Sequence, residues 1–217
     1  MVEDRLNRYL PVVFGVNLPL PYRGVFLSVQ PASLQTPAGR AFLFSGPKRA
    51  VLSGFAAVRA DLWDAGSNAP AANAAMTVEV AGSVWTGIAD ENGKVLVMFP
   101  FPLVDRVQLG SPPGLGQGPA DSMTWPMKVR VRYAPPAQTF PLAATPLGWP
   151  WTTTPSLKSI LDGQPPAKVI ASGNPVIAVD ELDVNLTFGK PLVLKSRIID
   201  PAQDRSQLLI SWGTSPP

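Results

Sequence analysis

Apolar and polar positions alternate most regularly between residues 58 and 102. Met76, Val78 and Val80 are separated by polar residues, which is the period of two that places every second side chain of a strand on one face. A β-branched and aromatic run at residues 84–86 follows a glycine-containing loop at residues 81–83. This pattern predicts two half-buried strands that are joined by a short hairpin loop.

A second reversal is predicted at Asp90-Glu91-Asn92-Gly93. Aspartate and asparagine followed by glycine are typical of a type I turn that ends in a residue with positive φ. Residues 94–99 then form a third, strongly apolar strand. We therefore expect Gly93 to adopt a backbone conformation that strains a β-branched residue.

The order of these features resembles the carboxypeptidase regulatory-like (transthyretin-like) domains over roughly residues 51–102. Ala89 departs from the threonine that usually precedes the turn aspartate. The resemblance implies an Ig-like antiparallel sandwich that has no active site and serves as an accessory or assembly module. It rests on an opening strand that ends near Asp61 and Asp64, a loop with Gly66 and Pro70, Ala74 before the next strand, Thr86, the turn at residues 90–93, and Pro100 at the close.

Later strands complete a mainly β protein. Residues 125–133 alternate, with Met127, Val129, Val131 and Tyr133 on one face and Lys128, Arg130 and Arg132 on the other. Such a basic row binds phosphates or an acidic partner, or is a solvated strand face whose charges neighbouring carboxylates compensate. We favour the second interpretation, with Glu181 and Asp183 as the carboxylates. Residues 191–199 and 207–212 are predicted to form an antiparallel pair.

Residues 134–175 are rich in proline, which keeps the backbone extended. Thr154 as N-cap, Pro155 at the first helical position and Gly163 as the stop predict a short helix with Leu157, Ile160 and Leu161 on one face. Trp149 and Trp151 flank Pro150. We expect this segment to lie against a surface, either its own sandwich or another subunit. The interface candidates are Trp149, Trp151, Leu157, Ile160, Leu161 and the basic row Lys128, Arg130 and Arg132.

The chain is thus predicted as an antiparallel Ig-like or transthyretin-like β-sandwich with an extended N-terminal arm and a Pro-rich segment that contains one short helix. Short strands at residues 25–29 and 40–44 either add to the sandwich or dock on a neighbouring subunit. The divisions are an N-terminal arm or added strands at 1–46, the sandwich core at 47–133, the Pro-rich wrapping segment at 134–175, and C-terminal strands at 176–217.

The amino-acid composition limits the classes of function that the chain can have. The chain has 217 residues, of which 15% are charged, whereas about 25% is ordinary for a soluble domain. This shortage of charge suggests that other subunits cover part of the surface. The absence of His and Cys from the sequence excludes thiol nucleophiles, disulfides, Cys/His zinc sites and Ser-His-Asp triads. No apolar run approaches the length of a membrane span, and no secretory signal begins the sequence, so we expect cytoplasmic synthesis.

The sequence gives only weak evidence for binding of nucleic acids, phosphates or metal ions. A net charge of +3, with basic and aromatic residues that do not interleave, makes nucleic-acid binding an unfavoured interpretation. The glycines at residues 110–121 do not match a phosphate-binding motif, and we expect this loop to be exposed. The acidic clusters lack calcium-loop spacing, so no cofactor or metal is predicted. These clusters are Asp61 with Asp64, Asp90 with Glu91, and Asp180, Glu181 with Asp183.

Three functions remain in order of preference. The first is a non-enzymatic assembly subunit whose partners are other protein subunits or further copies of itself. As a whole, the chain resembles the accessory proteins of phage-tail-like contractile injection particles, which implies incorporation into a particle that is later released. The second is a carbohydrate- or peptide-binding module that uses Trp63, Trp85, Trp149 and Trp151 as stacking surfaces. The third is an enzyme that depends on carboxylates alone.

Overall fold

The computed structural model describes residues 4, 6, 8–13, 43–102, 123–140, 154–173, 176–197 and 206–213. About half of them belong to strands and few to helices, so the prediction of a mainly β protein is confirmed. The strands are β1 (Phe55–Asp64), β2 (Ala69–Pro70), β3 (Ala75–Val80), β4 (Ser83–Ile88), β5 (Lys94–Pro100), β6 (Thr124–Arg132), β7 (Pro166–Gly173), β8 (Val176–Val179), β9 (Leu182–Thr187), β10 (Leu192–Leu194) and β11 (Leu208–Ser211); the helical elements are η2 (Pro135–Ala137) and η4 (Ser159–Gly163).

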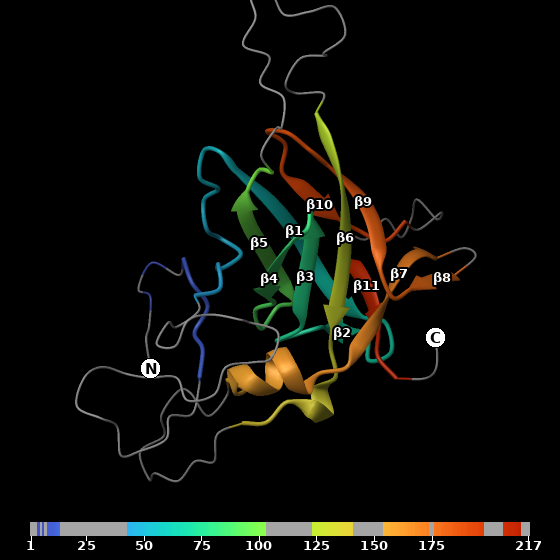
Figure 1. Cartoon of the computed structure of the whole chain (residues 1–217). Helices are drawn as coiled ribbons and strands as arrows, with labels where there is room; N and C mark the ends of the chain where they lie inside the picture. Colours follow the sequence, from blue (N-terminus) through green and yellow to red (C-terminus); the bar gives the residue numbers. More distant parts are fainter. Residues whose placement is uncertain are drawn as a thin grey trace, which may run out of the picture.

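These strands form one mixed sheet that curls around an apolar core (Figure 1). The hydrogen-bonded order is β10-β1-β11-β7-β6-β3-β4, while β2 and β5 also pair with β1, β8 with β7, and β9 with β6. The curl brings β4 next to β5 without pairing them: a Cβ at Gly87 of β4 would lie 2.9 Å from Val97 Cγ2 of β5. Gly87 therefore allows the sheet to close tightly at this point.

Both predicted reversals after β3 are present. The β3–β4 hairpin turns at Ala81 and Gly82, whose φ values of 47° and 75° fit a type I′ turn. Gly93 has φ 76°, as predicted, and its N–H donates to the Asp90 carbonyl over 3.0 Å. The Asp90 carboxylate accepts hydrogen bonds from the backbone N–H groups of Asn92 and Lys94, each at 2.9 Å. Asp90 therefore acts as a turn former.

The strand partners differ from the antiparallel sandwich that the sequence predicts. After the turn at Gly93, β5 crosses over to pair with β1 instead of returning along β4. The predicted antiparallel pair of C-terminal strands is wrong, because β10 and β11 each pair in parallel with β1. The long connections between these strands make parallel pairing possible, and local sequence carries no signal for it.

Part of the N-terminal region packs on the sheet. The Arg59 guanidinium on the outer face of β1 donates to the backbone carbonyls of Pro47 and Arg49, which fixes that segment against the strand. Leu43 and Phe44, from the predicted strand at residues 40–44, lie outside regular strands. The predicted strand at residues 25–29, the loop at 110–121, Trp149 and Trp151 fall outside the described residues.

A short helix is confirmed in the Pro-rich segment, at one end of the sheet (Figure 1). Residues 157–158 are also helical and run directly into η4, so the helix begins later than predicted and Ser156 takes the capping role given to Thr154. The Ser156 hydroxyl accepts from the Ser159 N–H over 3.3 Å, and the Ser156 carbonyl accepts from the Ile160 N–H over 3.1 Å. The Ser156 N–H already donates to the Thr139 carbonyl, so it is not available to a cap at Thr154.

Candidate interaction surface

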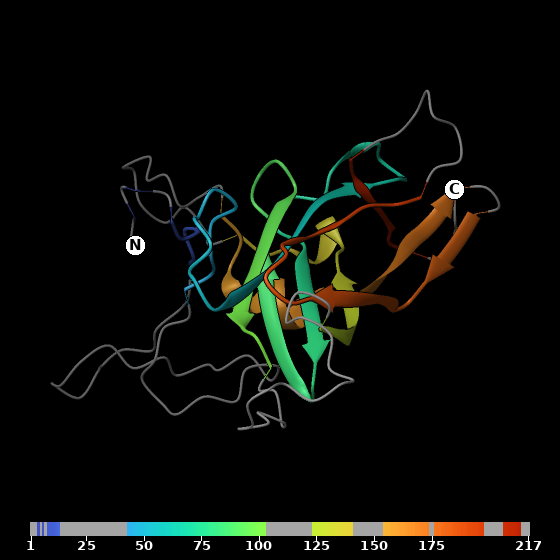
Figure 2. The ribbon, with the colours of Figure 1, turned by 90° about the horizontal axis from the view of Figure 1, so that it is seen from above.

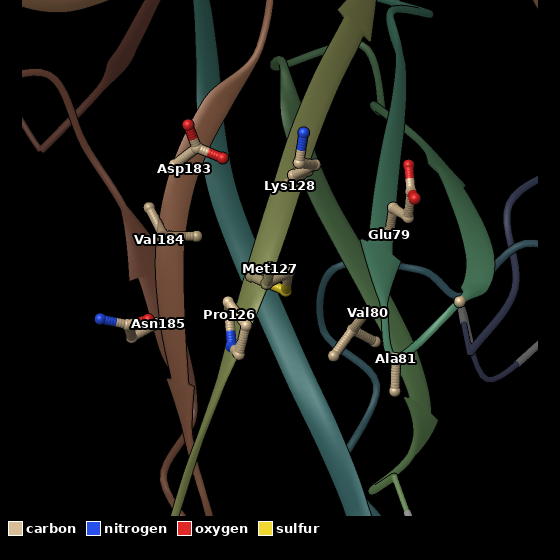
Figure 3. Close-up of a pocket in the computed structure, with 10 residues that line it drawn as sticks. Glu79, Val80, Ala81, Pro126, Met127, Lys128, Asp183, Val184 and Asn185 are labelled. Atoms are coloured by element: carbon tan, nitrogen blue, oxygen red, sulfur yellow. The ribbon is translucent and has the colours of Figure 1, made fainter.

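The basic row predicted on β6 lies at the centre of an exposed sheet face. The register places Lys128 opposite Glu79 of β3 on one side and opposite Asp183 of β9 on the other. Figure 3 shows these three side chains in a row across the three strands. We call this surface the charged face, and it comprises Glu79, Lys128, Arg130, Arg132, Glu181 and Asp183.

Glu181 links two of the basic residues and is confirmed as a compensating carboxylate. It forms ion pairs with Lys128 and Arg130, and Arg130 also pairs with Glu79 at 2.9 Å. The hydrogen bond from Lys128 lowers the pKa of Glu181, which burial alone would raise, and the same bond raises the pKa of Lys128. Although desolvation would lower the pKa of Arg130, hydrogen bonds to Glu181 and Glu79 raise it.

Arg132, the third basic residue, has a different role. Its Nη1 donates to the Leu161 carbonyl over 2.8 Å, which ties β6 to the short helix. The charged face thus has three cations and three anions, and its charges balance. A balanced face does not concentrate phosphate groups, which supports the solvated-face interpretation over phosphate binding.

A shallow groove of about 310 Å³ opens on the same face, which we call the β6 groove (Figure 3). Its lining includes Met127 and Val80, which are core residues only 1% and 2% exposed, together with Val184 and the polar residues Lys128, Asp183 and Asn185. Its remaining lining residues are Glu79, Ala81, Gly82 and Pro126. The groove therefore offers hydrogen-bond donors and acceptors beside a small apolar area.

The apolar interface candidates of the helix are buried within the chain. Leu157, Ile160 and Leu161 are 5%, 3% and 3% exposed and pack with Phe44, Ala75 and Ile88 in a second apolar cluster. A partner contact therefore has to use other residues. Trp149 and Trp151 lie outside the described residues, so their role at an interface stays a prediction.

Gln164, which sequence reasoning missed, holds this helix to the sheet. Its side chain is 2% exposed, and its Oε1 accepts hydrogen bonds from the Ala134 N–H at 3.0 Å and from Gln138 Nε2 at 3.3 Å. Its Nε2 donates to the carbonyls of Asn73 at 2.9 Å and Ile160 at 3.1 Å. A fully hydrogen-bonded buried amide of this kind is costly to replace.

Two of the tryptophans considered for ligand stacking have partners in the chain. Trp85 stacks on Phe99 with ring centroids 5.9 Å apart and is partly buried against the core. Trp63 donates from Nε1 to the Asn68 side chain over 3.2 Å. Trp85 therefore offers little free ring surface to a sugar or peptide.

The Asp64 carboxylate is 1% exposed and organises a loop. It accepts hydrogen bonds from the Gly66 and Ser67 N–H groups, the Ser67 hydroxyl and Trp212 Nε1. Burial raises the pKa of Tyr133, and the charge of nearby Asp64 raises it further. Among the described residues, no group of three His, Cys, Asp or Glu side chains is arranged to hold a metal ion.

Three edge strands carry an unusual feature that the sequence pattern did not identify. Over the described residues, β4, β8 and β10 each pair with one neighbour: β3, β7 and β1, respectively. Each carries a strongly exposed β-branched side chain: Val84 at 60%, Ile177 at 48% and Val193 at 59%. None of these three strands contains a charged residue or a proline.

No family model, curated protein or solved structure matches this chain. Within the described part of the chain, no helix is long and apolar enough to cross a membrane.

Proposed function

We propose that this protein is a non-enzymatic structural subunit that assembles with other protein subunits through the edges of its sheet. The single observation that supports this proposal is the composition of β4, β8 and β10, described above. Soluble proteins normally protect edge strands with charged residues, especially lysine, or with proline, because an open edge pairs with strands of other chains. A strand that lacks both, and that exposes a β-branched side chain, is suited to strand addition.

Other edges of the same sheet are protected, which makes the contrast informative. β5 begins with Lys94 and ends with Pro100, and β9 carries Asp183 on its exposed face. The β7–β8 hairpin also projects away from the rest of the sheet in both views (Figures 1 and 2). A projecting apolar edge is accessible to a partner strand, and we place the main contact at β8.

The sequence resembles regulatory-like domains over residues 51–102 and, as a whole, accessory proteins of contractile injection particles. We propose that the curled sheet is a variant of the Ig-like or transthyretin-like sandwich, and that the assembly is a phage-tail-like contractile injection particle. The low fraction of charged residues, 15%, is compatible with a surface that other subunits cover.

The test is the effect of a gatekeeper charge on association. Ile177→Lys should abolish or strongly weaken self-association of the purified chain, measured by light scattering over a range of concentrations. Asn92→Lys adds the same charge at an exposed turn and should leave association unchanged. Equal association of both variants and the parent would exclude β8 as the contact, and a monodisperse parent at high concentration would exclude homotypic assembly.

A second function, a carbohydrate- or peptide-binding module, is supported by the β6 groove. Asp183, Asn185 and Lys128 supply donors and acceptors that suit a small polar ligand. Chemical-shift changes confined to these residues on addition of short peptides or oligosaccharides would favour this function over assembly.

A further inference from the structure

Residues 8–13 form a short extended segment that lies between two other parts of the chain, and we call it the strap. On one side, the Leu10 N–H donates to the Phe44 carbonyl over 2.9 Å, and the Gly46 N–H donates to the Arg8 carbonyl over 2.7 Å. On the other side, the Leu157 N–H donates to the Val13 carbonyl over 2.7 Å. The strap therefore fills a site formed by residues 44–46 and 156–157, beside the short helix (Figure 1).

The strap is held by few side chains. Leu10 and Val12 are partly buried and pack against the second apolar cluster, which includes Phe44 and Leu157. The Arg49 guanidinium lies 4.6 Å from the centre of the Tyr9 ring. The strap contributes only two half-buried side chains to the second apolar cluster. It can therefore leave its site, and an equivalent strand can enter.

The connection between the strap and its site is long. Residues 14–42 separate Val13 from Leu43, although Leu10 is hydrogen-bonded to Phe44. An extended chain of that length spans up to roughly 100 Å. Connecting Val13 to Leu43 within one chain needs only about 10 Å. The connection therefore does not force the strap into the site of its own chain.

We infer that the strap is exchanged between copies of this protein, so that residues 8–13 of one chain fill the strap site of a second copy. This inference rests on the proposed assembly function, which supplies the high local concentration. The contacts of the strap are the same within one chain and between chains, so the balance is set by effective concentration. A linker within one chain gives an effective concentration on the order of millimolar, which neighbouring subunits in an assembly match.

The absence of cysteine from the sequence makes exchange directly measurable. Tyr9 and Ser45 are antiparallel partners, and the flanking hydrogen bonds identify them as a non-hydrogen-bonded pair. Such pairs have Cα atoms about 4.5 Å apart, which suits a disulfide. Chains with Tyr9→Cys and chains with Ser45→Cys should be co-expressed, oxidised mildly and separated without reductant.

Exchange predicts a covalent heterodimer, because the two cysteines then meet across chains. A matched control uses Thr77→Cys and Thr86→Cys chains, whose positions are opposite each other in the β3–β4 hairpin and are kept in one chain by its two-residue turn. We expect at least about tenfold more heterodimer from the strap pair than from this control. Because Tyr9→Cys removes the ring beneath Arg49, Val13→Cys with Ser156→Cys serves as a second strap pair.

The outcomes separate this inference from the proposed function. If both strap pairs give no more heterodimer than the control pair while the parent chain still self-associates, strap exchange is wrong. Assembly through the edge strands is then unaffected. If the doubly substituted Tyr9→Cys/Ser45→Cys chain forms an intrachain disulfide without covalent dimers, the strap stays in its own chain and exchange is again wrong. If the parent chain remains monomeric at high concentration and no heterodimer forms, both strap exchange and edge-strand self-assembly are wrong.

Discussion

A Cβ at Gly93 would lie 2.3 Å from the carbonyl oxygen of Leu62. This contact joins the turn before β5 to the strand with which β5 pairs, and the Leu62 N–H donates to the Gly93 carbonyl over 2.8 Å. Glycine is thus required twice at this position, once for its positive φ and once for the close approach of backbone.

Gly93→Ala should destabilise the fold by about 3 kcal/mol, because a strained φ is combined with a backbone clash. Chemical denaturation measures the change in the free energy of unfolding. Gly189→Ala is the matched control, since Gly189 also has positive φ, at 69°, but a Cβ there meets no atom within 4 Å. It should cost about 1 kcal/mol, and equal losses for the two variants would show that the contact with Leu62 yields without cost.

Gln164→Leu should destabilise the protein by about 3 kcal/mol, since it leaves buried backbone groups of Ala134, Asn73 and Ile160 without the side chain that pairs with them. Thermal denaturation measures the loss. Gln138→Leu removes a partly buried amide from the same network and should cost less. A neutral Gln164→Leu would mean that water or the neighbouring Gln138 replaces these bonds.

Leu161→Ala should cost about 3 kcal/mol, because the side chain is buried within its own chain. Trp149→Ala with Trp151→Ala should leave the melting temperature unchanged and weaken incorporation into the proposed assembly, as the sequence predicts for a docking segment. Loss of the fold in the double tryptophan variant would place both rings in the core of their own domain instead.

The charged face predicts a small acid sensitivity. The folded-state pKa of Glu181 lies below the ordinary value of 4.5, so its contribution to stability is present above pH 4.5 and is lost as the pH falls through the folded-state pKa. The raised pKa of Lys128 makes its contribution present below pH 10.5 and lost at still higher pH. Between pH 4.5 and pH 10.5, the ion pair of Glu181 with Lys128 contributes a constant amount to the free energy of unfolding.

Glu181→Gln should therefore lose less stability than the parent when both are moved from pH 7 to pH 3, measured as the difference in melting temperature. Glu91→Gln, at an exposed turn position, should retain the parent difference. Because the pairs are exposed, this is the smallest effect predicted here. An unchanged acid response in Glu181→Gln would show that solvent screens the network fully.

The features that the sequence predicts well are local. The β3–β4 hairpin, the positive φ of Gly93 and the two faces of β6 depend on residues a few positions apart, where turn chemistry and the period of two act directly. Glu181 was identified from the sequence as a carboxylate that compensates the basic row because residues 180–188 show an alternation of their own, although Glu181 itself lies just before β9. The short helix was placed correctly, but its cap was displaced by a contact of Ser156 with the distant Thr139.

The features that escaped prediction depend on residues far apart in the chain. Parallel pairing of β1 with β10 has no local signature, since an apolar strand accepts either direction. Gln164 looks like any polar residue after a helix until Ala134 and Asn73 are brought around it. The apolar face of the helix was identified, but the sequence left open what covers it, and Phe44 and Leu10 proved to contribute.

The position of β1 has a consequence for biosynthesis. β1 is the first of the described strands to be synthesised, whereas its parallel neighbours β10 and β11 are the last two. Until Ser211 has left the ribosome, Val58 and Leu62 of β1 lack the hydrogen-bond partners and apolar contacts that β10 and β11 provide. Such long-range pairing slows folding and leaves apolar strands exposed in the nascent chain. A ribosome-associated chaperone is therefore expected to increase the yield of folded protein more than it does for a sheet assembled from consecutive hairpins.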